Sequence, residues 1–138
     1  MTRALLLTSL LCCFGCSAEL VETDADRIDG RFVLATVNDQ PLPATISTTQ
    51  GQTMVVTEGS LFLDSIRDFT LQYRYTENLG NYLALYAGKW SVSDGKLTLR
   101  NEAGLSIFPD NEAADSLIVI RSTYGDSAPA PLVLRFMR

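Results

Sequence analysis

The chain has 138 residues, no histidine, and 16 acidic against 11 basic residues, which gives a net charge of −5. Without histidine, Ser-His-Asp catalysis, Cys-His catalysis and His-ligated zinc are excluded together. No run of Lys or Arg supplies the basic surface that nucleic acids require. We therefore expect a protein that is not an enzyme, needs no cofactor or metal, and does not bind nucleic acid.

Residues 1–15 are predicted to be a signal peptide. Arg3 precedes a mostly apolar run, and Gly15 stands directly before Cys16. This order is typical of a secretory signal, and the run is far shorter than the ~20 residues that span a bilayer. The junction resembles the lipobox of bacterial lipoproteins, although Cys13 stands where Leu is usual. The resemblance implies that Cys16 carries lipid. The alternative is an ordinary secretory signal that leaves a free cysteine.

Residues 16–29 are interpreted as the lipidated cysteine followed by a flexible acidic tether. Residues 17–29 hold five acids against one Arg and do not alternate like a strand; a coil of this length reaches ~20 Å. Ser17 follows the cysteine, whereas Asp at that position marks retention in the inner membrane of Gram-negative bacteria. The resemblance therefore implies a cell-envelope protein, anchored by lipid to the outer membrane and facing the periplasm.

Residues 30–138 are predicted to form one β-domain without disulfides, because all three cysteines lie at or before residue 16. Short runs that alternate or are rich in β-favouring residues predict the strands. They are Arg31–Val37, Thr53–Glu58, Ser60–Asp64, Asp68–Thr76, Asn81–Ser93, Lys96–Arg100, Ser116–Tyr124 and Leu132–Arg138.

Turn signals separate these runs. Asp94-Gly95 predicts a type I′ hairpin, and Glu58-Gly59 is interpreted as a turn between two strands. Gly88 lies inside a long run and predicts a bulge or bend there. Asn101–Asp115 is expected to be irregular. This number of short strands favours an antiparallel barrel or a β-sandwich.

Several motifs in order resemble small bacterial lipocalin-like lipoproteins. Residues 30–43 read GRFVLATVNDQPLP, residues 58–63 read EGSLFL, residues 88–99 read GKWSVSDGKLTL, and residues 131–136 read PLVLRF. Asp39 departs from the pattern, in which Gly is usual. The resemblance implies an up-and-down barrel of about eight strands, with a β-sandwich as the alternative. The family is largely uncharacterised, so it implies a fold and a location but no reaction.

A lipocalin-like barrel gives one aromatic face a binding interpretation. Tyr73, Tyr82, Tyr86 and Trp90 fall on inward faces of adjacent predicted strands and are the candidate lining of a cavity for a small apolar ligand. The alternative is that these rings fill the core. In that case the protein is an inhibitor or a partner-binding protein that acts through the loops Ser47–Gln52 and Asn101–Asp115.

Two further expectations concern packing. Trp90 is predicted to be among the most buried residues of the domain, because it lies on the apolar face just before the Asp94-Gly95 hairpin. The resemblance also implies that Arg135, from the final strand, packs across the ring of Phe32. The alternative is an exposed arginine on an edge strand.

Overall fold

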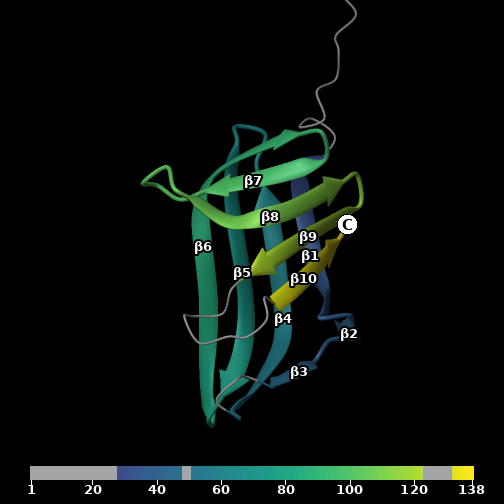
Figure 1. Cartoon of the computed structure of the whole chain (residues 1–138), viewed down its shortest axis with the longest axis vertical. Coiled ribbons are helices and arrows are strands. Elements are labelled where there is room, and N and C mark those ends of the chain that lie inside the picture. The colour runs from purple at the N-terminus through teal and green to yellow at the C-terminus, as the bar shows by residue number, and fades with distance from the viewer. Residues whose placement is uncertain (1–27, 48–50, 123–131) are drawn as a thin grey trace, which may run out of the picture.

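The computed structural model describes residues 28–47, 51–122 and 132–138, and the elements assigned in them are all β-strands (Figure 1). The predicted signal peptide, Cys16 and most of the predicted tether lie outside these ranges. The strands are β1 (Gly30–Val37), β2 (Gln40–Pro41), β3 (Ala44–Ser47), β4 (Thr53–Leu63), β5 (Asp68–Glu77), β6 (Gly80–Ser93), β7 (Lys96–Arg100), β8 (Ser106–Ala114), β9 (Leu117–Ser122) and β10 (Leu132–Met137).

Eight of these strands close an antiparallel barrel. From β4 to β10 each strand pairs with the next along the chain, and β1 closes the ring by pairing with both β10 and β4. The short strands β2 and β3 are additions that pair with β1 and β4. In Figure 1, β4, β5 and β6 run along the long axis while β7 and β8 cross them. The structure confirms the predicted all-β, up-and-down, lipocalin-like barrel.

The predicted turn at Glu58-Gly59 is wrong, because β4 runs through it without a break. Glu58 pairs with Arg74 and Gly59 with Tyr73, after a register shift that follows Val56. Gly59 leaves room for its neighbours to pack closely, because a Cβ on it would lie 2.9 Å from the Leu34 side chain and 3.0 Å from Tyr73 Cβ. The glycine lets β1 and β5 approach β4.

The expectation that Asn101–Asp115 is irregular is also wrong, since β8 occupies most of it. Leu97 of β7 pairs with Asn111, and Leu99 pairs with Ile107. One residue of β7 therefore faces three of β8, so β8 carries a bulge larger than the usual single extra residue. Phe108 has φ of 54° in this bulge, and Pro109 follows it. The bulge removes the regular alternation by which a strand is recognised in a sequence.

Other turn signals are confirmed. Asp94 and Gly95 have φ of 52° and 72°, as a type I′ hairpin requires. Gly88 has φ of 155° at the point where β6 passes from its pairing with β5 to its pairing with β7. A second hairpin of the same kind was not predicted: it turns at Asn78 and Leu79, with φ of 49° and 67°.

The barrel interior holds the inward-facing side chains of all eight strands, and Trp90 is 2% exposed among them, as predicted. The fully buried large side chains are Phe32, Met54, Leu61, Leu63, Phe69, Leu71, Tyr73, Leu97, Leu99, Ile118, Ile120 and Phe136. These side chains form one hydrophobic cluster that lines the barrel interior.

Arg138, and not Arg135, packs across Phe32. The Arg138 guanidinium lies 4.8 Å from the centre of the Phe32 ring and donates to the backbone oxygen of Asp29. Arg135 lies between the inward-facing Leu134 and Phe136, so alternation turns it outward, where its Nε is 2.8 Å from Asp39 Oδ1. The contact implied for Arg135 is therefore wrong.

Candidate functional site

The structure divides the four predicted lining residues between two places. Tyr73 and Tyr82 are linked through Tyr75, whose ring centre lies 6.0 Å from that of Tyr73 and 5.3 Å from that of Tyr82. Tyr86 lies nearby and packs edge-on against Phe108. Within this aromatic group, Tyr73 is buried, Tyr86 is half-buried, and Tyr82 is 48% exposed.

Trp90 is separate from this group, beyond the bend at Gly88. Its indole Nε1 donates to the Asp64 backbone oxygen at 2.9 Å, and the Arg67 guanidinium lies 4.6 Å from the ring centre. Trp90 therefore contacts the turn between β4 and β5. Its role as a ligand contact stays a prediction.

Two polar residues that sequence reasoning missed are buried in the barrel, and one of them, Ser122, lies near Tyr73. Asn111 and Ser122 are each 1% exposed. Neither the Asn111 amide atoms nor Ser122 Oγ has a hydrogen-bond partner in the part of the chain that the structure describes. A buried polar group without a partner costs ~1–3 kcal/mol and calls for an explanation, such as a bound water or ligand.

Strand register places these two polar residues close to each other. Glu112 pairs with Val119, so Asn111 lies beside Ile120, and Ser122 follows on the same face of β9. Diagonal neighbours of this kind are ~7–8 Å apart. Asn111 was missed because it falls in the segment expected to be irregular. The alternation of Ile118, Ile120 and Ser122 was the signal that could have found the serine.

Tyr73 joins β5 to this polar group. Burial raises the pKa of the Tyr73 phenol far above its usual 10.0, and the neighbouring Tyr86 and Tyr75 raise it further. Ser122, whose hydroxyl faces the same phenol, acts in the opposite direction. Tyr73 is therefore a neutral phenol at physiological pH. We call Tyr73, Tyr86, Asn111 and Ser122 the inner polar cluster.

This pKa shift predicts a loss of stability in alkali. Above pH ~10 the unfolded chain ionises Tyr73, whereas the fold keeps it protonated. The stabilisation is fully present below the usual pKa and is lost above it, at up to about 1.4 kcal/mol per pH unit. Urea unfolding between pH 8 and 11 measures this loss. Tyr73→Phe should flatten the profile, and the exposed Tyr82→Phe should not. An unchanged slope in Tyr73→Phe contradicts the assignment.

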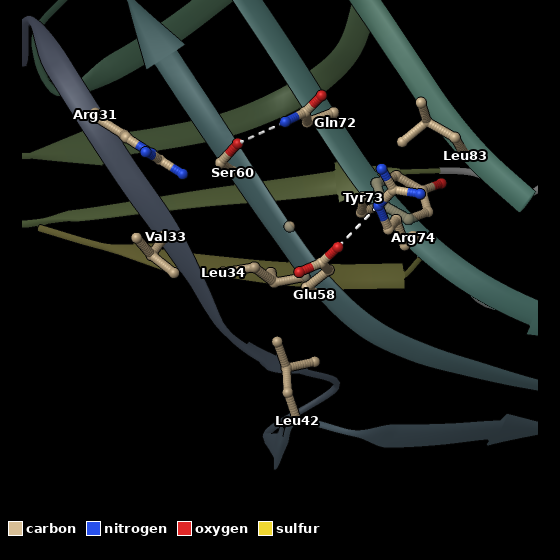
Figure 2. Close-up of a pocket in the computed structure, with 11 residues that line it drawn as sticks. Arg31, Val33, Leu34, Leu42, Glu58, Ser60, Gln72, Tyr73, Arg74 and Leu83 are labelled. Carbon is tan, nitrogen blue, oxygen red and sulfur yellow. Dashed lines mark hydrogen bonds and ion pairs between the residues drawn. The ribbon is translucent and has the colours of Figure 1, made fainter.

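A hollow with a volume of about 240 Å³ lies on the outer surface over β1, β4 and β5 (Figure 2). Glu58 and Arg74 form a 2.8 Å ion pair across it, and Gln72 Nε2 donates to Ser60 Oγ at 3.2 Å. Both members of the ion pair are mostly exposed. These polar groups satisfy one another and stay hydrated, so the groove makes a weaker case for a ligand than the inner polar cluster does.

The chain matches no protein-family model, no curated protein and no solved structure. Within residues 28–47, 51–122 and 132–138, no helix has the length and apolar character needed to cross a bilayer. The same residues contain no group of three acidic, Cys or His side chains that can hold a metal ion.

Proposed function

We propose that this protein binds a small, mainly apolar molecule inside its barrel and holds one polar group of that molecule at the inner polar cluster. The observation that carries the proposal is the pair of buried, partnerless side chains Asn111 and Ser122. Binding sites are mainly apolar and contain a few convergent polar groups. Here aromatic and aliphatic side chains supply the apolar walls, and the amide, the hydroxyl and the neutral Tyr73 phenol supply the polar contacts.

The proposed setting is the cell envelope. Lipid on Cys16 would hold the barrel at a membrane surface, facing the periplasm, where apolar molecules partition. Each buried methylene adds ~0.8 kcal/mol of membrane affinity, so two or more acyl chains anchor a protein firmly. The proposed role is non-catalytic: the barrel carries or sequesters its ligand and does not transform it.

A second candidate is a partner-binding or inhibitory lipoprotein that uses an exposed loop. Leu105, in the turn between β7 and β8, is exposed over 65% of its surface, and such a side chain suits a protein contact. The other predicted docking loop, Ser47–Gln52, lies partly outside the described residues. Capture of a stoichiometric protein without any bound small molecule would favour this function.

The ligand proposal is tested by titration with a matched pair of probes, a long-chain alcohol and an alkane of the same length. The single tryptophan, Trp90, reports on the barrel by its fluorescence, and the melting temperature rises with any ligand that binds only the folded state. We expect saturable changes with the alcohol and weaker ones with the alkane. No saturable change with either probe overturns the proposal.

Asn111→Leu separates binding from folding. Replacing a partnerless buried amide with an apolar side chain of similar size removes its desolvation cost. We expect the free energy of unfolding to rise by about 1–3 kcal/mol, while the preference for the alcohol over the alkane disappears. Asn38→Leu is the contrasting control: Asn38 Oδ1 accepts a 2.8 Å bond from the Val133 amide, so its loss should destabilise. A destabilised Asn111→Leu protein shows that the amide has a partner.

The anchor is tested separately. Labelled palmitate should enter the wild-type protein in cells and should not enter Cys16→Ser, because the sulfur that is proposed to carry the lipid is gone. The variant should then be released from the membrane fraction by salt-free washing. Labelling that persists in Cys16→Ser means that another residue is modified or that the anchor is misassigned.

A further inference from the structure

Within the described part of the chain, one side of β6 is open over its first half. β6 pairs with β5 from Gly80 to Lys89, but with β7 only from Lys89 to Ser93. Among the described strands, none pairs with residues 81–87 on the side away from β5. An unpaired edge presents a row of N–H and C=O groups that can form a ladder with another strand.

The hydrogen-bonding groups of this edge can be assigned from the hairpin. The positive φ of Asn78 and Leu79 gives a two-residue type I′ turn, so Glu77 and Gly80 exchange both of their backbone bonds. In an antiparallel pair, bonded and non-bonded residues then alternate. The residues whose backbone groups point to the open side are Asn81, Leu83, Leu85 and Ala87.

The sequence of this edge is symmetric. Residues 82–86 read Tyr-Leu-Ala-Leu-Tyr, the same in both directions about Ala84. When two copies pair antiparallel about Ala84, Leu83 of one copy faces Leu85 of the other. Both of these residues have outward-pointing backbone groups, and so do Asn81 and Ala87, which face each other in turn. The register that the side chains favour is thus also one that the hydrogen bonds allow.

The charge and exposure of this edge also suit pairing between two copies of the chain. Residues 80–88 contain no Asp, Glu, Lys or Arg, so two copies meet here without like charges facing each other, despite a net charge of −5. Leu83 and Leu85 are 48% and 59% exposed. Protein edges are normally guarded by charge, proline or a bulge, and residues 81–87 have none of these.

We propose that two copies of this protein form a symmetric dimer by pairing their β6 edges about a two-fold axis through Ala84. The pairing extends the sheet of each barrel into that of its partner. The four leucines, Leu83 and Leu85 from each copy, form one apolar cluster on the outer face. Such an isologous contact closes on itself and does not propagate into a fibre.

Charge substitutions test both the dimer and its register. Light scattering or sedimentation of the purified chain should give a dimer that dissociates on dilution. Leu83→Lys with Leu85→Lys places Lys opposite Lys in the proposed register and should give a monomer. Leu83→Lys with Leu85→Glu places opposite charges face to face and should restore the dimer. Phe62→Lys is the control, because Phe62 is 47% exposed on β4, which is paired on both sides at this residue.

Cross-linking gives a second readout. Ala84 faces its own copy across the axis as a non-bonded pair, in which Cα atoms are ~4.5 Å apart, within disulfide range. Ala84→Cys should therefore form a dimer linked by a disulfide between the two copies, which a reducing agent separates. Tyr82→Cys should not form this link, because Tyr82 faces Tyr86 of the other copy. A wild-type monomer at every concentration, or a dimer that survives the double-lysine variant, overturns the proposal.

Discussion

Gly88→Ala should be strongly destabilising, with a loss of about 3–5 kcal/mol. A Cβ on Gly88 would lie 1.9 Å from the Arg100 backbone oxygen and 2.9 Å from its carbonyl carbon, and φ is 155°. The obstacle is backbone, so it cannot rotate away as a side chain can. Overpacking and backbone strain each cost ~1–3 kcal/mol. A loss of this size is a large share of the 5–15 kcal/mol that stabilises a typical domain.

Gly104→Ala is the matched control for this prediction. Gly104 also has a positive φ, 76°, but a Cβ there meets nothing within 4 Å. It should therefore cost only the ~1–2 kcal/mol of a left-handed conformation. Urea denaturation of both variants measures the difference. Equal losses in the two variants would mean that β6 can shift away from β7 at the bend, and that the contact with Arg100 does not hold the corner.

Trp90→Ala should lower the free energy of unfolding by about 3–5 kcal/mol, the usual cost of removing a buried large aromatic side chain. The ring is 2% exposed, and its indole N–H and backbone N–H donate to the oxygens of Asp64 and Arg67. The substitution leaves a cavity and also loosens the turn between β4 and β5. Thermal and urea unfolding report the loss.

Trp90→Phe distinguishes these two effects. It keeps most of the apolar volume but removes the donor to the Asp64 oxygen, so we expect an intermediate loss of ~1–3 kcal/mol. If Trp90→Ala leaves the denaturation midpoint unchanged, the ring does not hold the turn and the packing described for this corner is wrong.

The fold could be predicted from the sequence because inward and outward residues alternate regularly in most strands. β5 and the Asp94-Gly95 hairpin depend on local patterns, and these survive in the structure. The errors fall where a tertiary contact decides the local conformation. Gly59 has the residue type of a turn, but its missing side chain admits Leu34 and Tyr73. In β8, the bulge at Phe108 breaks the alternation, so nothing local marks it as a strand.

The candidate site was accessible only in part. The tyrosines of β5 and β6 alternate visibly, and Tyr73 and Tyr86 do fall together inside the barrel. Ser122 approaches Tyr73 only through barrel closure, which brings β9 and β5 together across the interior. Polar residues in such strands look ordinary in a sequence, since neither burial nor the lack of a hydrogen-bond partner has a local signature.

The closure of the ring has a consequence for how the chain folds. β1 is the first strand of the barrel and β10 the last, yet Leu34 pairs with Phe136 and Val37 with Leu134. A chain that is synthesised from its N-terminus therefore cannot complete its barrel until β10 has emerged. Until then β1 and β9 each keep an open edge. Pairings between such distant segments form slowly, and exposed edges promote aggregation during the delay. This protein should therefore depend on holding chaperones until synthesis of the chain is complete.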